Sequence, residues 1–215
     1  MKEHKIVIIG AGGHAKVVCD SLQLSLKQGG GGAIVGFVDD DLRLSGKSLL
    51  GFPILGPVES LVDLEFDSLI VGVGDNRIRR RVYEWAKGKE YAFVNAIHPT
   101  AVIASDVSIG EGATIFGNVV VNSGTSIGNN VILNTACTVD HDCSIADHVH
   151  IAPGVHLAGG VVVGEGAFVG IGASIIPYKK VGKHSVIGAG VVVVDDIPDG
   201  VTAVSGRARV IKSDG

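Results

Sequence analysis

A six-residue repeat runs through the second half of the chain. Every sixth residue from position 97 to position 193 is Ile, Leu or Val, and the residue two before each is small or β-branched from Ala101 to Val191, except Lys179. This period fits neither an amphipathic helix nor a strand that alternates every two residues. It is typical of a β-solenoid built from hexapeptide units, each with one strand and one turn. The large positions are Ile97, Ile103, Ile109, Ile115, Val121, Ile127, Leu133, Val139, Ile145, Ile151, Leu157, Val163, Val169, Ile175, Val181, Ile187 and Val193.

Three hexapeptide units close one triangular coil of about 18 residues, and stacked coils lie ~4.8 Å apart. Residues 97–195 therefore predict roughly five and a half coils. Residues 18 positions apart lie above one another, so His141 is expected beside Gly159 and His148 beside Gly166. Because glycine has no side chain, both histidines are expected to border an uncovered surface, as a ligand groove requires.

The first 95 residues show a different pattern. Short β-rich runs at 5–9, 34–38, 68–73 and 91–94 alternate with helical patterns at 15–26, 57–64 and 76–87. Such alternation predicts a small parallel sheet with right-handed crossovers. The fold class expected is an α/β Rossmann-like lobe over residues 1–95, followed by an all-β parallel β-helix domain over residues 96–215.

Charge and composition exclude several function classes. The net charge of -4 argues against nucleic acid as the main partner, because neutralising phosphates needs a basic face. The three cysteines, an odd number, predict a reduced, cytoplasmic protein. The apolar run at 6–9 is too short for a signal segment and no stretch is long enough to span a bilayer, so no membrane insertion is expected.

A glycine turn, Gly10-x-Gly12-x-x-Ala15, lies between the first expected strand and helix. Backbone N–H groups and a helix N-terminus at such a turn can hold a phosphate. Asp39 ends the second expected strand, where an acidic residue can contact a ribose. Taken alone, the pattern suggests a dinucleotide-binding dehydrogenase, but 95 residues with four strands form only one mononucleotide half.

Six short segments carry a family resemblance: residues 8–14 (IIGAGGH), 37–40 (FVDD), 73–79 (VGDNRIR), 133–135 (LNT), 139–143 (VDHDC) and 148–150 (HVH). With the repeat, they resemble the left-handed β-helix acyltransferases. The chain is similar over its whole length to the branch that contains bacterial sugar-nucleotide acetyltransferases, such as the UDP-N-acetylbacillosamine N-acetyltransferases, and sialic-acid O-acetyltransferases. The resemblance implies a left-handed β-helix and acetyl transfer from acetyl-CoA to an amine or hydroxyl of a sugar.

The resemblance also implies roles for individual residues. His141 matches the general base of the family, which removes a proton from the acceptor as it attacks the thioester. Asp142 follows where the bacillosamine enzymes carry Glu, and an adjacent carboxylate raises the basicity of the imidazole. The acetyl-CoA groove is implied at His150, Ile171 and Ala189.

The N-terminal lobe is implied to bind the UDP part of a UDP-linked 4-amino sugar, of the 4-amino-4,6-dideoxy-N-acetylhexosamine type. Relatives place the active site between neighbouring prisms, so a homotrimer is implied, and no metal is expected. The chain end resembles the closing segment of the family, where Arg207 and Arg209 are available for CoA phosphates. The substrate-binding residues implied are Gly12, Gly13, His14, Asp39, Asp40, Gly74, Asn134 and Thr135.

Other polar residues have more ordinary interpretations. His148 and His156 are expected to be structural or solvent-facing. The basic run at 77–81 is expected to form a solvated helix face that balances nearby acidic residues. Lys179 and Lys180 interrupt the repeat and are weaker candidates for contact with CoA phosphates.

Three alternatives remain open. An O-acetyltransferase acting on sialic acid or a related sugar shares much of the same pattern. A zinc enzyme resembling the γ-type carbonic anhydrases would use the same prism, but those enzymes bind zinc through two histidines five residues apart, and His141, His148, His150 and His156 contain no such interval. A sugar-nucleotide sensor without catalysis would keep its function after His141→Ala.

Overall fold

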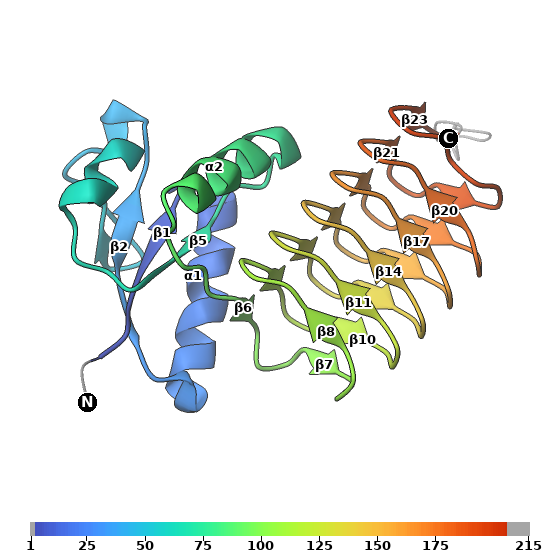
Figure 1. Ribbon diagram of the computed structural model, residues 1–215, viewed down its shortest axis with the longest axis horizontal. Coiled ribbons are helices and arrows are strands. Elements are labelled where there is room, and N and C mark those ends of the chain that lie inside the picture. Colours follow the sequence, from blue (N-terminus) through green and yellow to red (C-terminus); the bar gives the residue numbers. More distant parts are fainter. Residues whose placement is uncertain (1–2, 206–215) are drawn as a thin grey trace, which may run out of the picture.

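The computed structural model describes residues 3–205, which form an α/β lobe and a β-helix that extends away from it (Figure 1). The lobe holds a three-stranded parallel sheet in the order β2-β1-β5, with β1 at Lys5–Ile9, β2 at Ala33–Val38 and β5 at Ser68–Val71. Helix α1 (Gly13–Ser25) follows β1, and helix α2 (Asn76–Gly88) follows β5. The expected parallel α/β lobe is therefore confirmed.

The lobe departs from the expectation in two segments. The predicted helix at 57–64 is a 3-10 helix, and the predicted fourth strand is reduced to one bridge between Leu69 and Phe93. This segment stays short because the chain enters the first coil of the β-helix at Ala96. In residues 3–205 no helix has the length and hydropathy to cross a membrane. The remaining lobe elements are η1 (Leu26–Gly30), η2 (Leu42–Leu44), β3 (Ser48–Leu49), β4 (Phe52–Pro53) and η3 (Val58–Asp63).

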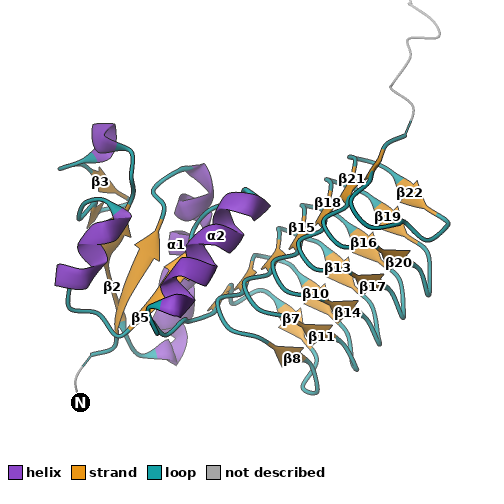
Figure 2. Ribbon diagram, turned by 45° about the horizontal axis from the view of Figure 1, so that its top comes forward, coloured by secondary structure: helices purple, strands orange, loops and turns teal. Residues whose placement is uncertain are grey.

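The β-helix consists of two-residue strands in three parallel sheets, one on each side of a triangular coil (Figure 2). The lobe face comprises β6 (Ala96–Ile97), β9 (Thr114–Ile115), β12 (Ile132–Leu133), β15 (His150–Ile151), β18 (Phe168–Val169), β21 (Val186–Ile187) and β23 (Thr202–Ala203). The second face comprises β7 (Val102–Ile103), β10 (Val120–Val121), β13 (Thr138–Val139), β16 (His156–Leu157), β19 (Ser174–Ile175) and β22 (Val192–Val193). The third face comprises β8 (Ser108–Ile109), β11 (Ser126–Ile127), β14 (Ser144–Ile145), β17 (Val162–Val163) and β20 (Lys180–Val181).

Neighbouring strands on each face are offset by one coil. On the lobe face Leu133 pairs with Ile151, and Ile151 pairs with Val169. The Ile, Leu and Val residues of the six-residue repeat point inward and form one continuous core, buried from Ile115 onward. The predicted left-handed parallel β-helix is therefore confirmed, and its register decides which residues face outward on each side.

Helix α1 packs on the rows of the lobe face that come first in the chain, around β6, β9 and β12, which we call the lower rows. Its Ala15 and Val18 share a buried core with Phe116 and Ile132 of the β-helix. The lobe therefore covers the lower rows, whereas the outward side chain of Val186, higher on the same face, remains 37% exposed.

Candidate active site

His141 lies in the turn that joins the second face to the third face, between β13 and β14. Its Nδ1 is 2.8 Å from Oδ2 of Asp142. Its main-chain N–H donates to Oδ1 of Asp140 at 2.8 Å, and the same oxygen accepts from the side-chain amide of Asn122 at 2.8 Å. The side chain of His141 is 51% exposed, so these contacts hold an imidazole that faces solvent.

Neighbouring carboxylates raise the pKa of His141. The hydrogen bond with Asp142 is the largest cause, and the charges of Asp140 and Asp142 add to it. A raised pKa makes the imidazole a stronger base, and a hydrogen bond at Nδ1 fixes the tautomer that leaves Nε2 as the acceptor. Asp142 therefore makes the contact that the resemblance implies, although its side chain is shorter than that of Glu.

The two glycines expected beside histidines behave differently. A Cβ added to Gly159 would lie 2.6 Å from Cε1 and Nε2 of His141, so the imidazole rests directly against this glycine. At Gly166 the free space is taken by the ring of His184, and His148 itself is only 6% exposed. The expectation of an uncovered surface at His148 is therefore wrong, because α2 covers that corner.

A cavity of about 520 Å³ adjoins the His141 corner on the second face. Asn122, Asp140 and His156 are among its walls. Nδ1 of His156 lies 2.8 Å from Oγ1 of Thr138 on this exposed face. The polar groups that hold His141 therefore border a concave surface.

The glycine turn of the lobe leaves the start of α1 open. Gly10 has a φ of +99°, a conformation that favours glycine. Gly12 caps α1 without a side-chain hydrogen bond, and the first turn of α1 carries no acidic residue. A Cβ added to Gly12 or Gly13 would meet nothing within 4 Å. The positive end of α1 therefore faces open space, which suits an anion.

Asp39 and Asp40 lie beside this turn at the carboxyl end of β2. The carboxylate of Asp39 accepts from the N–H of Ala11 at 2.6 Å and from the N–H of Asp41 at 2.8 Å. Oδ1 of Asp40 accepts from the N–H of Val58 at 2.9 Å. Asp39 therefore fixes the shape of the glycine turn, while the exposed Asp40 lies next to it.

His150 lies where the lobe meets the β-helix. Its Nδ1 is 3.3 Å from the carbonyl oxygen of Gly74, and its Nε2 is 3.2 Å from the amide nitrogen of Asn134. Since a carbonyl oxygen only accepts, Nδ1 carries the proton and Nε2 accepts from Asn134. The ring centroid of His150 is 6.1 Å from that of His14 and 5.1 Å from that of Phe168. Four predicted site residues thus form one group, the junction cluster: His14, Gly74, Asn134 and His150.

Both imidazoles of the junction cluster are uncharged at neutral pH. Burial, aided by the positive charge of Arg79, lowers the pKa of His14 to about 4 and that of His150 to about 3. Within residues 3–205, the buried Nε2 of His14 has no hydrogen-bond partner. The cluster therefore presents neutral hydrogen-bonding groups rather than a charged pair.

A second cavity of about 520 Å³ opens above the junction cluster. It lies between the start of α2 and the upper rows of the lobe face, with Gly74, Phe168 and Val186 among its walls. One of the predicted substrate residues, Gly74, therefore borders a space that the lobe leaves uncovered.

The remaining predicted residues form a column on the corner between the lobe face and the second face. Thr135 donates its main-chain N–H to Oδ1 of Asn134 at 2.8 Å. Ile171, which is 60% exposed, and the exposed Ala189 lie on the same corner at whole-coil intervals above Thr135. Arg207 and Arg209, named for contact with CoA phosphates, lie outside the described residues.

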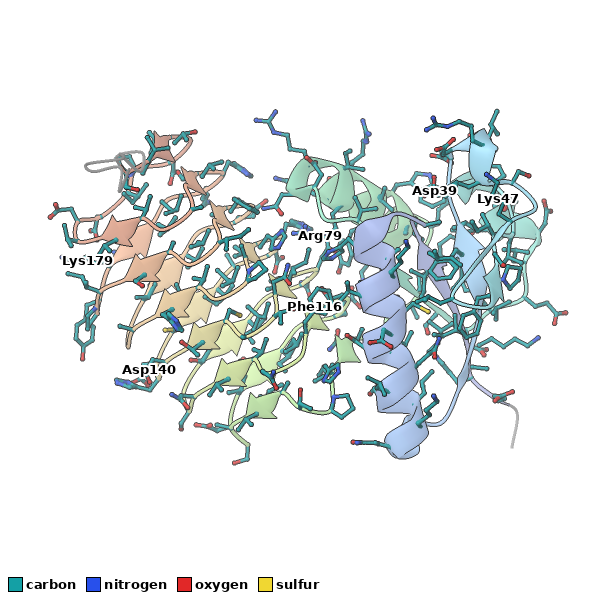
Figure 3. All side chains as sticks on the ribbon, turned by 180° about the vertical axis from the view of Figure 1, so that it is seen from behind. Asp39, Lys47, Arg79, Phe116, Asp140 and Lys179 are labelled. Atoms are coloured by element: carbon teal, nitrogen blue, oxygen red, sulfur yellow. The ribbon has the colours of Figure 1, made fainter. Side chains whose placement is uncertain are left out.

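One chain does not bring His141 to the junction cluster. His150 belongs to the lobe face, whereas the turn of His141 joins the other two faces and so forms the opposite corner of the triangular coil. Figure 3 shows Asp140, the neighbour of His141, at an outer edge of the β-helix, well away from Arg79 at the junction and from Asp39 in the lobe.

Sequence reasoning missed the burial of Arg79. Its neighbours Arg77 and Arg81 are exposed, as expected for a solvated helix face, but Arg79 is only 1% exposed. The available signal was helical spacing, because Asn76, Arg79 and Tyr83 lie three and four residues apart and share one side of α2.

The histidines of the β-helix do not converge. Across residues 3–205, no three His, Cys, Asp or Glu side chains are grouped so that they could hold a metal ion. His148 contacts Asn130, and His156 contacts Thr138 on another face. The side chains weighed as zinc ligands thus have separate partners.

Gly159→Ala tests the placement of His141. The new Cβ would overlap the imidazole, so we expect the ring to move and kcat to fall about tenfold or more, since small displacements of catalytic groups are costly. The matched control is Gly117→Ala, whose Cβ would make only ordinary contacts. Steady-state kinetics and thermal unfolding of both variants measure the effect. Unchanged kcat in Gly159→Ala would contradict the placement.

Comparison with known proteins places this architecture. Residues 5–86 match the family model described as the PglD N-terminal domain. PerB from Caulobacter crescentus, solved with CoA and GDP-perosamine, is 41% identical with a TM-score of 0.86, and the match covers 94% of each chain. The acetyltransferase domain of PglB from Neisseria gonorrhoeae, solved with acetyl coenzyme A, is 40% identical with a TM-score of 0.86 over 95% of this chain and 97% of that one.

WeeI from Acinetobacter baumannii is also similar, at 27% identity and a TM-score of 0.84, over 97% of this chain and 100% of that one. These matches span the lobe and the β-helix together. Two of them combine about 40% identity with nearly complete coverage of both chains. The chain therefore belongs to the hexapeptide-repeat, left-handed β-helix family of sugar acetyltransferases with a PglD-type N-terminal lobe, and it is an acetyltransferase.

Proposed function

We propose that the chain transfers the acetyl group of acetyl-CoA to the amine of a UDP-linked 4-amino sugar, with His141 as general base. The observation that carries this proposal is the solvent-facing imidazole of His141, held through Nδ1 by Asp142 at 2.8 Å. The amine nitrogen would bond to the thioester carbonyl carbon, and Nε2 would take the amine proton. The C–S bond would then break to release the CoA thiolate, which takes up a proton as His141 returns to its neutral form.

The solved relatives support an amine acceptor. The perosamine N-acetyltransferase from Caulobacter crescentus is named for transfer to nitrogen and was solved with CoA and GDP-perosamine. Two mutants of that enzyme, with histidine replaced by asparagine or by alanine, were solved with both compounds. Retained binding after loss of a histidine fits a catalytic role for such a residue rather than a binding role.

The active site is proposed to form between copies of the chain. In one copy His141 lies opposite the lobe face, and the second face beside it exposes the apolar side chains of Val102 (64%) and Val192 (62%). Packing this face against the next copy would bury these two valines, which lie at its two ends, and bring His141 toward that copy's junction cluster. Repetition around a threefold axis closes a homotrimer.

Acetyl-CoA would then lie between two copies. His150, Ile171 and Ala189 would line it from one copy, and His141 from the other. Ile171 and Ala189 are exposed on the corner that follows the lobe face, so an extended ligand can run along that corner. His150 lies at the lower end of this path, beside Asn134, which would place the thioester end there.

The nucleotide would bind at the glycine turn of the lobe. The open N-terminus of α1 at Gly12 and Gly13 suits the diphosphate, and Asp39 and Asp40 lie next to it. UDP is the nucleotide that the family resemblance implies. A GDP-linked amino sugar is the second candidate, and the match with the GDP-perosamine enzyme favours it.

A CoA-release assay over several acceptors tests the reaction. We expect turnover with a UDP-4-amino sugar and none with CMP-sialic acid or free sialic acid. Preference for GDP-perosamine would show that the nucleotide is GDP and not UDP. Preference for a sialic acid would overturn N-acetylation. In the same assay His141→Ala should lower kcat about 100-fold or more with little change in KM, because general bases contribute on this scale. Full turnover of that variant would remove His141 from the mechanism.

Asp142→Asn tests the pair through its pH dependence. A general base works when neutral, so kcat should fall as the pH drops below the raised pKa of His141. Asn at position 142 removes the charge that favours the imidazolium, so the acidic limb should move to lower pH while the plateau kcat falls.

Asp106→Asn is the control for this pH profile. It makes the same charge change two coils away on the same corner, where the carboxylate binds Ser123 and Gly124 instead of His141. Its acidic limb should match that of the wild type. A limb that stays in place in Asp142→Asn would show that Asp142 does not set the basicity of His141.

A further inference from the structure

Helix α2 lies along the corner between the third face and the lobe face, and its contacts follow the coils. The side-chain amide of Asn76 donates to the carbonyl oxygen of Gly166 at 3.2 Å. The ring of Tyr83, at the other end of the same helix side, packs against Gly112, three coils below. The coils of His148 and Asn130 lie between these two contacts, and Arg79 reaches both, so this side of α2 meets four successive coils. Arg79 occupies the middle of this side.

The guanidinium of Arg79 bridges two coils. Its Nε donates to the carbonyl oxygen of Asn130 at 3.1 Å, and Nη2 donates to that of His148 at 2.7 Å. These two residues are 18 positions apart and hence on adjacent coils. Nη1 donates to Oδ1 of Asn76 at 2.9 Å and to the carbonyl oxygen of Gly74 at 3.3 Å. One buried side chain thus ties the lobe to the β-helix.

The carbonyl oxygen of Gly74 connects Arg79 to the junction cluster. It accepts from Nη1 of Arg79 and from Nδ1 of His150, each at 3.3 Å. The oxygen that orients the His150 imidazole is therefore itself fixed by the guanidinium. His14 lies beside the same loop, since a Cβ added to Gly74 would lie 3.5 Å from Cγ of His14.

We propose that Arg79 is a positioning residue for acetyl transfer: it clamps Gly74 to the β-helix and thereby sets the imidazoles of His14 and His150. This inference rests on the proposed function of the junction cluster. Arg79 acts through these neighbours and is not proposed to touch either substrate.

The charge of Arg79 supports a role beyond holding the fold together. Among residues 3–205, the carboxylates that form ion pairs do so with other partners, and Asp75 at the start of α2 acts on Arg79 only through longer-range attraction. Burial lowers the pKa of Arg79 to about 9, so it stays charged at neutral pH. An apolar side chain often stabilises such a joint equally well. The positive charge of Arg79 lowers the pKa values of His14 and His150 further, as the largest cause after their burial, and so helps to keep both imidazoles neutral.

Two substitutions separate position from charge. Arg79→Lys keeps a positive charge but cannot reach all of the guanidinium's acceptors, and Arg79→Met removes both. We expect both to lower kcat/KM for the amino-sugar nucleotide at least tenfold. In NMR titrations of ring-labelled histidines, wild-type His14 and His150 should not titrate above about pH 5. In Arg79→Met their pKa values should rise, and in Arg79→Lys their chemical shifts should change while they stay neutral.

Arg81→Met, an exposed position on the same helix, is the matched control and should leave kinetics and titrations unchanged. Thermal unfolding corrects each rate for the folded fraction. Arg79 would have a purely structural role if both folded variants showed kinetics within twofold of Arg81→Met, or if their histidine signals were identical to wild type. Failure of both variants to fold would assign the same role. If wild-type protein acetylates no amino-sugar nucleotide, the proposed function fails, and the NMR comparison still decides whether Arg79 sets the two imidazoles.

Discussion

The 18-residue coil is the constraint on which the rest of the structure depends. Inward Ile, Leu and Val residues stack from coil to coil without a break in register, so each sequence position belongs to a fixed side or corner. A side chain cannot move to another face without shifting the whole buried stack. The same register that places His150 on the lobe face therefore places His141 at the opposite corner, and it separates the proposed base from the nucleotide lobe within one chain.

The coil spacing also explains how the lobe is held. Because the coils stack only about 4.8 Å apart, one side of α2 contacts four successive coils along one corner through Asn76, Arg79 and Tyr83. Hydrogen bonds and packing along α2 thus hold the lobe to the β-helix at this junction. Through Gly74, the junction cluster borders the same cavity as the uncovered upper rows of the lobe face.

The β-helix could be predicted from periodicity alone, because each hexapeptide unit places one large apolar residue in the stacked core and so produces a six-residue repeat in the sequence. Other features depend on contacts that no local pattern carries. His148 borders glycine in the coil, yet it is buried by a helix about seventy residues earlier in the chain. Arg79 belongs to a run of arginines that is typical of a solvated helix face, but carbonyl groups of Asn130 and His148, far away in the sequence, accept hydrogen bonds from its buried guanidinium. The site residues came from family resemblance, and the contact between His141 and Asp142 required coordinates.

Mixed oligomers test the separation of His141 from the lobe most directly. His141→Ala subunits lack the proposed base, and Gly12→Glu subunits place a negative charge in the open space at the start of α1. Each variant alone should be inactive. If sites are shared between neighbours, random one-to-one trimers should recover about a quarter of wild-type activity, since about one site in four then combines an intact lobe with an intact base. Mixed oligomers as inactive as the separate variants would contradict the account.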